Sequence, residues 1–138
     1  MKVYNVVFDV DNYQSLLVKD QNVLKRKLLS IGGISKKQEW PNVLDTITDN
    51  ICAPPPHIYC CEATNMVLTT KTLDILVDVL PKNIELLPVK WLNDSGYITN
   101  VVGYVDCLNT DETEWFVDDA LGKKLFVDKF VFIKEKIP

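Results

Sequence analysis

The chain has 138 residues, of which 47% are hydrophobic and 25% charged, with only 5 glycines and 7 prolines. This composition excludes a disordered chain, a collagen-like fibre and a coiled coil, and the length predicts a single domain over residues 1–138. No apolar run approaches the roughly 20 residues of a membrane span, and Asp9 and Asp11 interrupt the N-terminal apolar stretch too early for a signal peptide. We therefore expect a cytoplasmic protein without membrane contact.

Charge is strongly segregated along the chain, although the net charge is only −4. Residues 1–37 have a balance of +4, residues 39–119 a balance of −11, and residues 120–138 a balance of +3. So acidic a centre repels the nucleic-acid backbone, which argues against a nucleic-acid partner, and it attracts a basic protein. The alternative is that solvated acidic loops serve only solubility.

The first elements in chain order are a strand, a short helix and an irregular connection. Alternating side chains from Tyr4 to Val10 predict a half-buried strand. Leucines spaced by one turn indicate a short helix within residues 20–31, ended by Gly32 and Gly33. Residues 35–56 are polar and proline-rich, which predicts an ordered but irregular connection.

The clearest helix signal lies at residues 70–80. Four apolar residues at helical spacing share one face there: Leu73, Leu76, Val77 and Leu80. Thr69 or Thr70 can cap the start of this helix, and Pro81 ends it.

Strands follow the helix. Leu87–Trp91, the turn residues 93–96 and the β-prone run 97–106 predict an antiparallel hairpin. A final extended run places Phe126, Phe130 and Phe132 on one face. Strands broken by one or two helices, without regular alternation, predict an α+β fold with a largely antiparallel sheet.

No catalytic, metal or cofactor site emerges from the residue pattern. Cysteines 52, 60, 61 and 107 lack zinc-site spacing, and on a strand Cys60 and Cys61 would point to opposite faces, so we expect thiols that are reduced and mostly buried. His57 is the only histidine and has no nucleophile near it in sequence. No phosphate-binding glycine loop is present. We therefore expect a protein that is not an enzyme and needs no cofactor.

One segment stands out as a candidate partner-binding site. Residues 111–119 place five acids around two large aromatic side chains. The residues are Asp111, Glu112, Glu114, Trp115, Phe116, Asp118 and Asp119. Protein interfaces use buried aromatic side chains as anchors, and charges beside them set the association rate. The alternative is that Trp115 and Phe116 belong to the core beneath a solvated acidic loop.

Several short motifs occur in an order shared with a known bacterial family. They are a strand ending near Asp11, Gly33 followed by Trp40-Pro41, Val67-Leu68-Thr69 before the helix, Leu86-Leu87-Pro88-Val89, Asn100-Val101-Val102 leading into Val105-Asp106-Cys107-Leu108, and Phe130-Val131-Phe132-Ile133-Lys134. In this order the chain resembles the polymorphic-toxin immunity family catalogued as number eleven, formerly a domain of unknown function. Members continue into a further helical segment, whereas this chain stops at Pro138, so we expect a shortened or trimmed member.

The resemblance implies a non-enzymatic protein that acts in the cytoplasm. Such a protein binds a cognate toxin, often one delivered by a contact-dependent or type VI secretion system, and blocks it stoichiometrically. The resemblance names neither the toxin nor its activity.

A second hypothesis comes from another functional class. A small enzyme or ligand-binding domain would hold convergent carboxylates in a pocket formed by residues 39–62, with His57 among them. A pocket of that kind would favour this hypothesis, and an exposed surface of acids and aromatic side chains would favour the inhibitor.

Overall fold

The computed structural model describes residues 7–22, 28–30, 33–62, 64–103, 106–118 and 120–136. The chain divides into two compact units, which are described separately: the barrel unit, residues 1–103, and the hairpin unit, residues 104–138. The expectation of one domain over residues 1–138 stays a prediction. Within the described part of the chain, no helix has the length and apolarity needed to cross a membrane.

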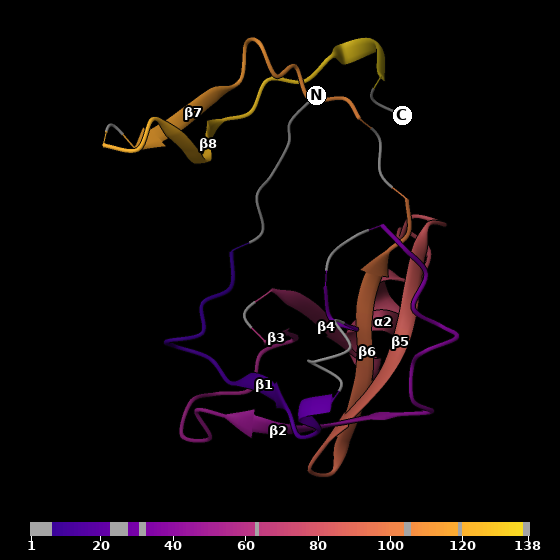
Figure 1. Ribbon diagram of the computed structural model, residues 1–138. Coiled ribbons are helices and arrows are strands. Elements are labelled where there is room, and N and C mark those ends of the chain that lie inside the picture. Colours follow the sequence, from indigo (N-terminus) through magenta and orange to yellow (C-terminus); the bar gives the residue numbers. More distant parts are fainter. Residues whose placement is uncertain are drawn as a thin grey trace. The chain divides into compact units, whose positions relative to one another are not determined.

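The barrel unit contains six strands that form a closed barrel in the order β1-β2-β5-β6-β4-β3 (Figure 1). The strands are β1 (Ser15–Val18), β2 (Leu44–Asp49), β3 (Ile58–Cys61), β4 (Asn65–Thr69), β5 (Ile84–Trp91) and β6 (Asp94–Val101). Strand β1 runs parallel to β3, strand β2 runs parallel to β5, and the other four neighbouring pairs are antiparallel. The α+β prediction is therefore confirmed in part: the strand pairing is largely antiparallel and a short helix accompanies it, but the protein is mostly β and its barrel is mixed.

The N-terminal predictions differ from the structure or lie outside the described residues. The strand predicted from Tyr4 to Val10 is absent over its described residues, 7–10, which are loop and turn. The first strand, β1, begins only at Ser15. Residues 1–6 lie outside the described residues, as do residues 23–27 and 31 of the predicted helix at 20–31; of the rest, residues 21–22 are helical and residues 28–29 form a turn. The stretch 35–56 is not wholly irregular, because β2 lies within it.

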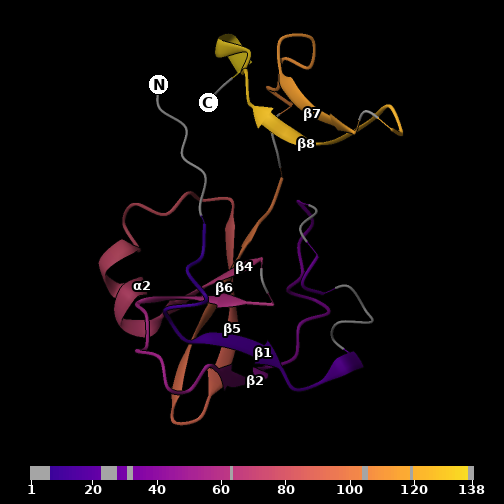
Figure 2. The same cartoon turned by 90° about the vertical axis from the view of Figure 1, so that its left-hand side faces the viewer.

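The α-helix α2 spans Thr70–Leu76 and confirms the start of the helix predicted over residues 70–80. The Thr69 hydroxyl accepts the Thr72 amide hydrogen at 3.1 Å, so Thr69 is the N-cap. Figure 2 shows α2 beside β4 and β6, which it contacts. The predicted apolar face is less buried than its spacing suggested, since Val77 is 54% exposed and Leu73 and Leu76 are only partly buried.

The predicted hairpin is present as β5 and β6, but its turn is tighter than expected. Trp91 pairs with Asp94, which leaves Leu92 and Asn93 as the turn. Leu92 has a left-handed φ of 46°. Gly96, expected in the turn, instead pairs with Thr69 inside the sheet.

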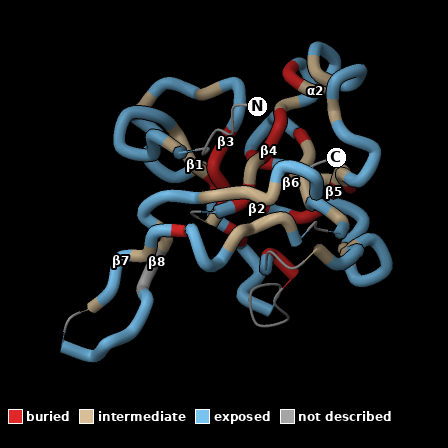
Figure 3. The backbone as a smooth tube through the Cα atoms, turned by 90° about the horizontal axis from the view of Figure 1, so that it is seen from above, coloured by how far each residue is buried: buried red, intermediate tan, exposed pale blue. Residues whose placement is uncertain are grey.

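The barrel interior is the core of this unit, as the buried segments in Figure 3 show. Its largest fully buried side chains include Leu16, Val67, Leu87, Val89 and Ile98. Cys61 belongs to this core, and burial raises the pKa of its thiol to about 12. Cys60 instead lines a small cavity with Phe8 and Tyr13, which confirms that the two neighbours face opposite sides.

The four cysteines are present as thiols, but they are less uniformly buried than predicted. Cys60 and Cys61 are buried, Cys107 is partly buried, and Cys52 is exposed. The prediction of mostly buried thiols therefore holds for the β3 pair and is wrong for Cys52.

A buried carboxylate fixes the segment before β2 to the barrel. Glu85 is 7% exposed and accepts hydrogen bonds from the Ser35 hydroxyl, from the Lys36 amide at 2.9 Å and from the Asn100 side-chain amide at 2.9 Å. Burial raises the pKa of the Glu85 carboxyl, but these hydrogen bonds and the positive charge of Lys37 outweigh it, so the pKa lies below its ordinary value. The Trp40 indole donates to the Pro88 carbonyl at 3.0 Å and fixes the same segment further along β5.

The hairpin unit contains β7 (Glu114–Asp118) and β8 (Lys123–Lys129), which pair antiparallel, followed by the short 3-10 helix η1 (Lys134–Lys136). A bridge joins Leu108 to Phe132. The Phe130 and Phe132 rings stack with their centroids 5.9 Å apart. This agrees with the prediction that the two side chains share one face of an extended run. The side chain of Phe126 lies outside the described residues.

We expect Gly96→Ala to separate β6 from β4. A carbon added at Gly96 would lie 2.3 Å from the Leu68 carbonyl oxygen, a backbone atom that cannot move alone. The free energy of unfolding should fall by about 1–3 kcal/mol in urea titrations. Ser95→Ala, at the exposed neighbouring position, is the control and should change it by less than about 0.5 kcal/mol. An alanine at position 96 as stable as glycine would contradict this packing.

We expect Glu85→Gln to destabilise the protein at neutral pH more than at acidic pH. Glutamine keeps the shape but lacks the negative charge that strengthens these three hydrogen bonds, so the loss at pH 7 should be about 1–3 kcal/mol. Because the folded pKa of Glu85 is lowered, its contribution is complete above the unfolded value, about 4.3, and disappears as the pH falls through the folded value. Urea titrations at pH 7 and pH 3 measure this. An equal difference at both values would contradict the assignment.

Candidate partner-binding hairpin

Most of the predicted site residues lie together at the start and along the length of β7. Glu114, Trp115, Phe116 and Asp118 are on the strand, and Asp111 and Glu112 are in the turn before it. Asp119 lies outside the described residues. The structure therefore presents the described acids and aromatic side chains on one hairpin.

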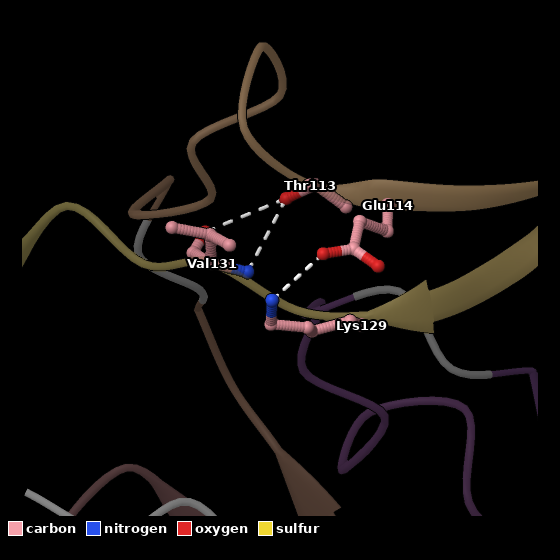
Figure 4. Close-up of polar contacts among 4 residues, drawn as sticks. All are labelled: Thr113, Glu114, Lys129 and Val131. Carbon is pink, nitrogen blue, oxygen red and sulfur yellow. Dashed lines mark hydrogen bonds and ion pairs between the residues drawn. The ribbon is translucent and has the colours of Figure 1, made fainter.

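Asn109 and Thr113 shape the turn that presents Asp111 and Glu112. The Asn109 side-chain oxygen accepts the amide hydrogens of both acids, at 3.2 and 3.3 Å. The buried Thr113 hydroxyl donates to the Asn109 carbonyl at 2.6 Å. It also accepts the Val131 amide hydrogen at 3.4 Å, as Figure 4 shows. Both acidic side chains remain exposed, and neither forms an ion pair with another described residue.

Glu114, unlike Asp111 and Glu112, forms an ion pair. Its carboxylate accepts a hydrogen bond from the Lys129 ammonium at 2.7 Å across the hairpin (Figure 4). This hydrogen bond and the charge of Glu114 raise the pKa of Lys129. Because both side chains are largely exposed, the pair contributes little stability, but it offsets one acidic charge of the candidate site.

Asp118 also has an internal role. Its carboxylate accepts the amide hydrogens of Ala120 at 2.9 Å and Leu121 at 3.0 Å, and its carbonyl accepts that of Gly122 at 2.7 Å. Gly122 takes the left-handed φ of 59° that closes the turn. Asp118 therefore shapes the β7–β8 turn.

Trp115 is partly covered within the hairpin itself. The Lys124 ammonium lies 4.9 Å from the centre of its ring, an arrangement favourable for a cation–π contact. The indole nitrogen is shielded from solvent and has no hydrogen-bond partner. Trp115 thus supports the hairpin as well as shaping its surface, which differs from both a core position and a fully exposed anchor.

The exposed apolar side chains of the hairpin extend beyond the predicted segment. Phe116 is 50% exposed, Val117 41%, Leu121 64% and Phe130 55%. Val117 and Leu121 were not predicted as surface residues, and Phe130 was predicted only on one face of an extended run, without a binding role. These side chains were missed because the seven residues of β8 pair with only five of β7. The pairing therefore shifts register twice, and side chains no longer alternate simply between the two faces of the hairpin.

The pocket expected from the second hypothesis does not form in the predicted way. A cavity of about 320 Å³ is lined by residues 45–48 and Ile51, but Asp45 is its single carboxylate, and Asp45 pairs with Lys90 at 3.4 Å. The side chain of His57 is exposed, and His57 is not among the residues that line this cavity. Among the described residues, no group of acids, cysteines and histidine is arranged to hold a metal ion.

Comparison with known proteins adds no relative. No protein-family model matches the chain, and no curated protein matches it. The resemblance to the immunity family therefore rests on the short motifs quoted from the sequence.

Proposed function

We propose that this protein binds and neutralises a cognate bacterial toxin by stoichiometric protein–protein contact, without catalysis and without a cofactor. The observation that supports it best is the hairpin unit, where an acidic turn precedes a small sheet with exposed apolar side chains: Val117 on β7, Leu121 in the β7–β8 turn and Phe130 directly after β8. Two-stranded sheets are only marginally stable in water. A partner that covers these side chains would therefore stabilise the hairpin and bury apolar surface of its own at the same time. The toxin as partner, met in the cytoplasm, is what the family resemblance adds.

The described contacts divide the work among the residues of the candidate site. Glu114 and Asp118 are engaged within the hairpin, so electrostatic steering of a basic partner depends chiefly on Asp111 and Glu112. Leu121 and Phe130 offer the larger exposed apolar surfaces, and we assign them the anchoring role. Trp115 and Phe116 complete the surface, with Trp115 fixed by Lys124.

The prediction concerns association and dissociation rates, measured by surface plasmon resonance. The ligand is the C-terminal domain encoded directly upstream of this chain, where the cognate toxin of an immunity protein is expected. The double variant Asp111→Asn, Glu112→Gln should lower the association rate and flatten its salt dependence. Phe130→Ala should raise the dissociation rate and cost about 2 kcal/mol or more of binding free energy.

Matched controls lie on the barrel unit. The double variant Asp74→Asn, Asp78→Asn removes the same charge from exposed positions, and Ile75→Ala removes a side chain that is 74% exposed on α2. Neither should change binding, and thermal melts establish that each variant is folded. If the two acidic double variants behave alike, or if the toxin domain forms no 1:1 complex and keeps its activity, the proposal is wrong.

A further inference from the structure

The 320 Å³ cavity lies beside the tip of the β5–β6 hairpin, and we call it the barrel-mouth cavity. It is lined by Lys19, residues 45–48 of β2, Ile51 and residues 90–92. Strand β2 pairs with β5 only as far as Thr46, because β5 ends in the turn at Leu92. Beyond that point β2 continues to Asp49, paired with β1 alone. The cavity therefore arises where β2 outruns one of its two neighbours.

Its walls are apolar and partly open to solvent. Ile47 is 46% exposed, Ile51 73% and Leu92 83%. Leu92 also takes a left-handed φ of 46°, a turn position that glycine or asparagine occupies without strain. A strained, exposed leucine is unfavourable in the isolated protein, and contact with an apolar ligand would offset that cost.

The polar side chains of the cavity are few, and those of Thr46, Lys90 and Asp45 are already engaged. The Thr46 hydroxyl donates to the Lys90 carbonyl at 3.0 Å, and the Lys90 ammonium pairs with Asp45. The Thr48 hydroxyl oxygen is shielded from solvent and has no hydrogen-bond partner. Among the described residues, Lys19 takes part in neither recorded ion pair. The Thr48 oxygen is therefore out of reach of a ligand in the open cavity, and it is the unpaired positive charge of Lys19 that favours an anionic ligand.

We propose that the barrel-mouth cavity binds a small amphipathic carboxylate. Its apolar body packs against Ile47, Ile51 and Leu92, and its carboxylate lies in the positive field of Lys19. The cavity volume falls within the range of small-molecule sites, at its lower end, which limits the ligand to a short chain or a single ring system. This site is separate from the partner-binding role of the hairpin unit.

The experiment titrates octanoate, octanol and octyltrimethylammonium into the full chain, below their micelle concentrations, by isothermal calorimetry. Octanoate should bind about tenfold or more tightly than the cation, because the same apolar body then meets Lys19 with the opposite charge. Equal affinity of the anion and the cation, or no octanoate binding at millimolar concentration, would overturn the proposal.

Variants locate the binding. Leu92→Gly removes an apolar wall while glycine tolerates the turn conformation, so it should weaken octanoate and octanol alike by about fivefold or more. Lys19→Gln should weaken octanoate and leave octanol unchanged. Ile75→Ala and Lys71→Gln, exposed positions on α2, are the matched controls and should change neither affinity. Octanoate binding that survives Leu92→Gly, or that falls equally in the controls, would place it elsewhere.

Discussion

The closed barrel depends on a short seam between β1 and β3, where strand pairing alone is insufficient. A single bridge, Leu16 to Cys61, joins these strands before β3 ends. Glu62 then turns into a left-handed φ of 50°, its amide donates to the Leu16 carbonyl at 3.1 Å, and its carboxylate accepts the Val18 amide hydrogen at 2.7 Å. A side chain thus replaces the next carbonyl of the ladder, and the two strand edges that an open sheet would expose are closed.

Closure at this seam encloses the core of the barrel unit. With β1 held in place, its inward residues Leu16 and Val18 complete an interior shared with β5 and β6. Glu85 and Trp40 then fix the loop that covers the β5 edge, and Gly96 lets β6 approach β4 closely. The barrel-mouth cavity is the local exception, because β2 there extends past β5.

Local signals in the sequence predicted the elements that local chemistry determines. Thr69 as a cap and the alternation around Trp91 identified α2 and the β5–β6 hairpin, since both depend on residues close in sequence. Strand β2 was not predicted, because it lies in a stretch of prolines and polar residues that indicated an irregular connection. Its parallel pairing with β5 also depends on residues far away in the sequence. For the candidate site, the sequence located the acids and aromatic residues but not their use: Lys129 and the β7–β8 turn engage Glu114 and Asp118, and the register shifts that expose Val117 have no simple pattern.

The seam is tested most directly by amide hydrogen exchange, followed by NMR on the full chain. Val18 should exchange slowly in the wild type, within about tenfold of the central β4 residue Val67, because its amide hydrogen is bonded to Glu62. In Glu62→Ala, exchange at Val18 and Cys61 should accelerate strongly, while Glu39→Ala, at an exposed glutamate, should leave both unchanged. A Val18 amide that exchanges as in an unstructured peptide in the wild type, or one indifferent to Glu62→Ala, would contradict a barrel closed by this side chain.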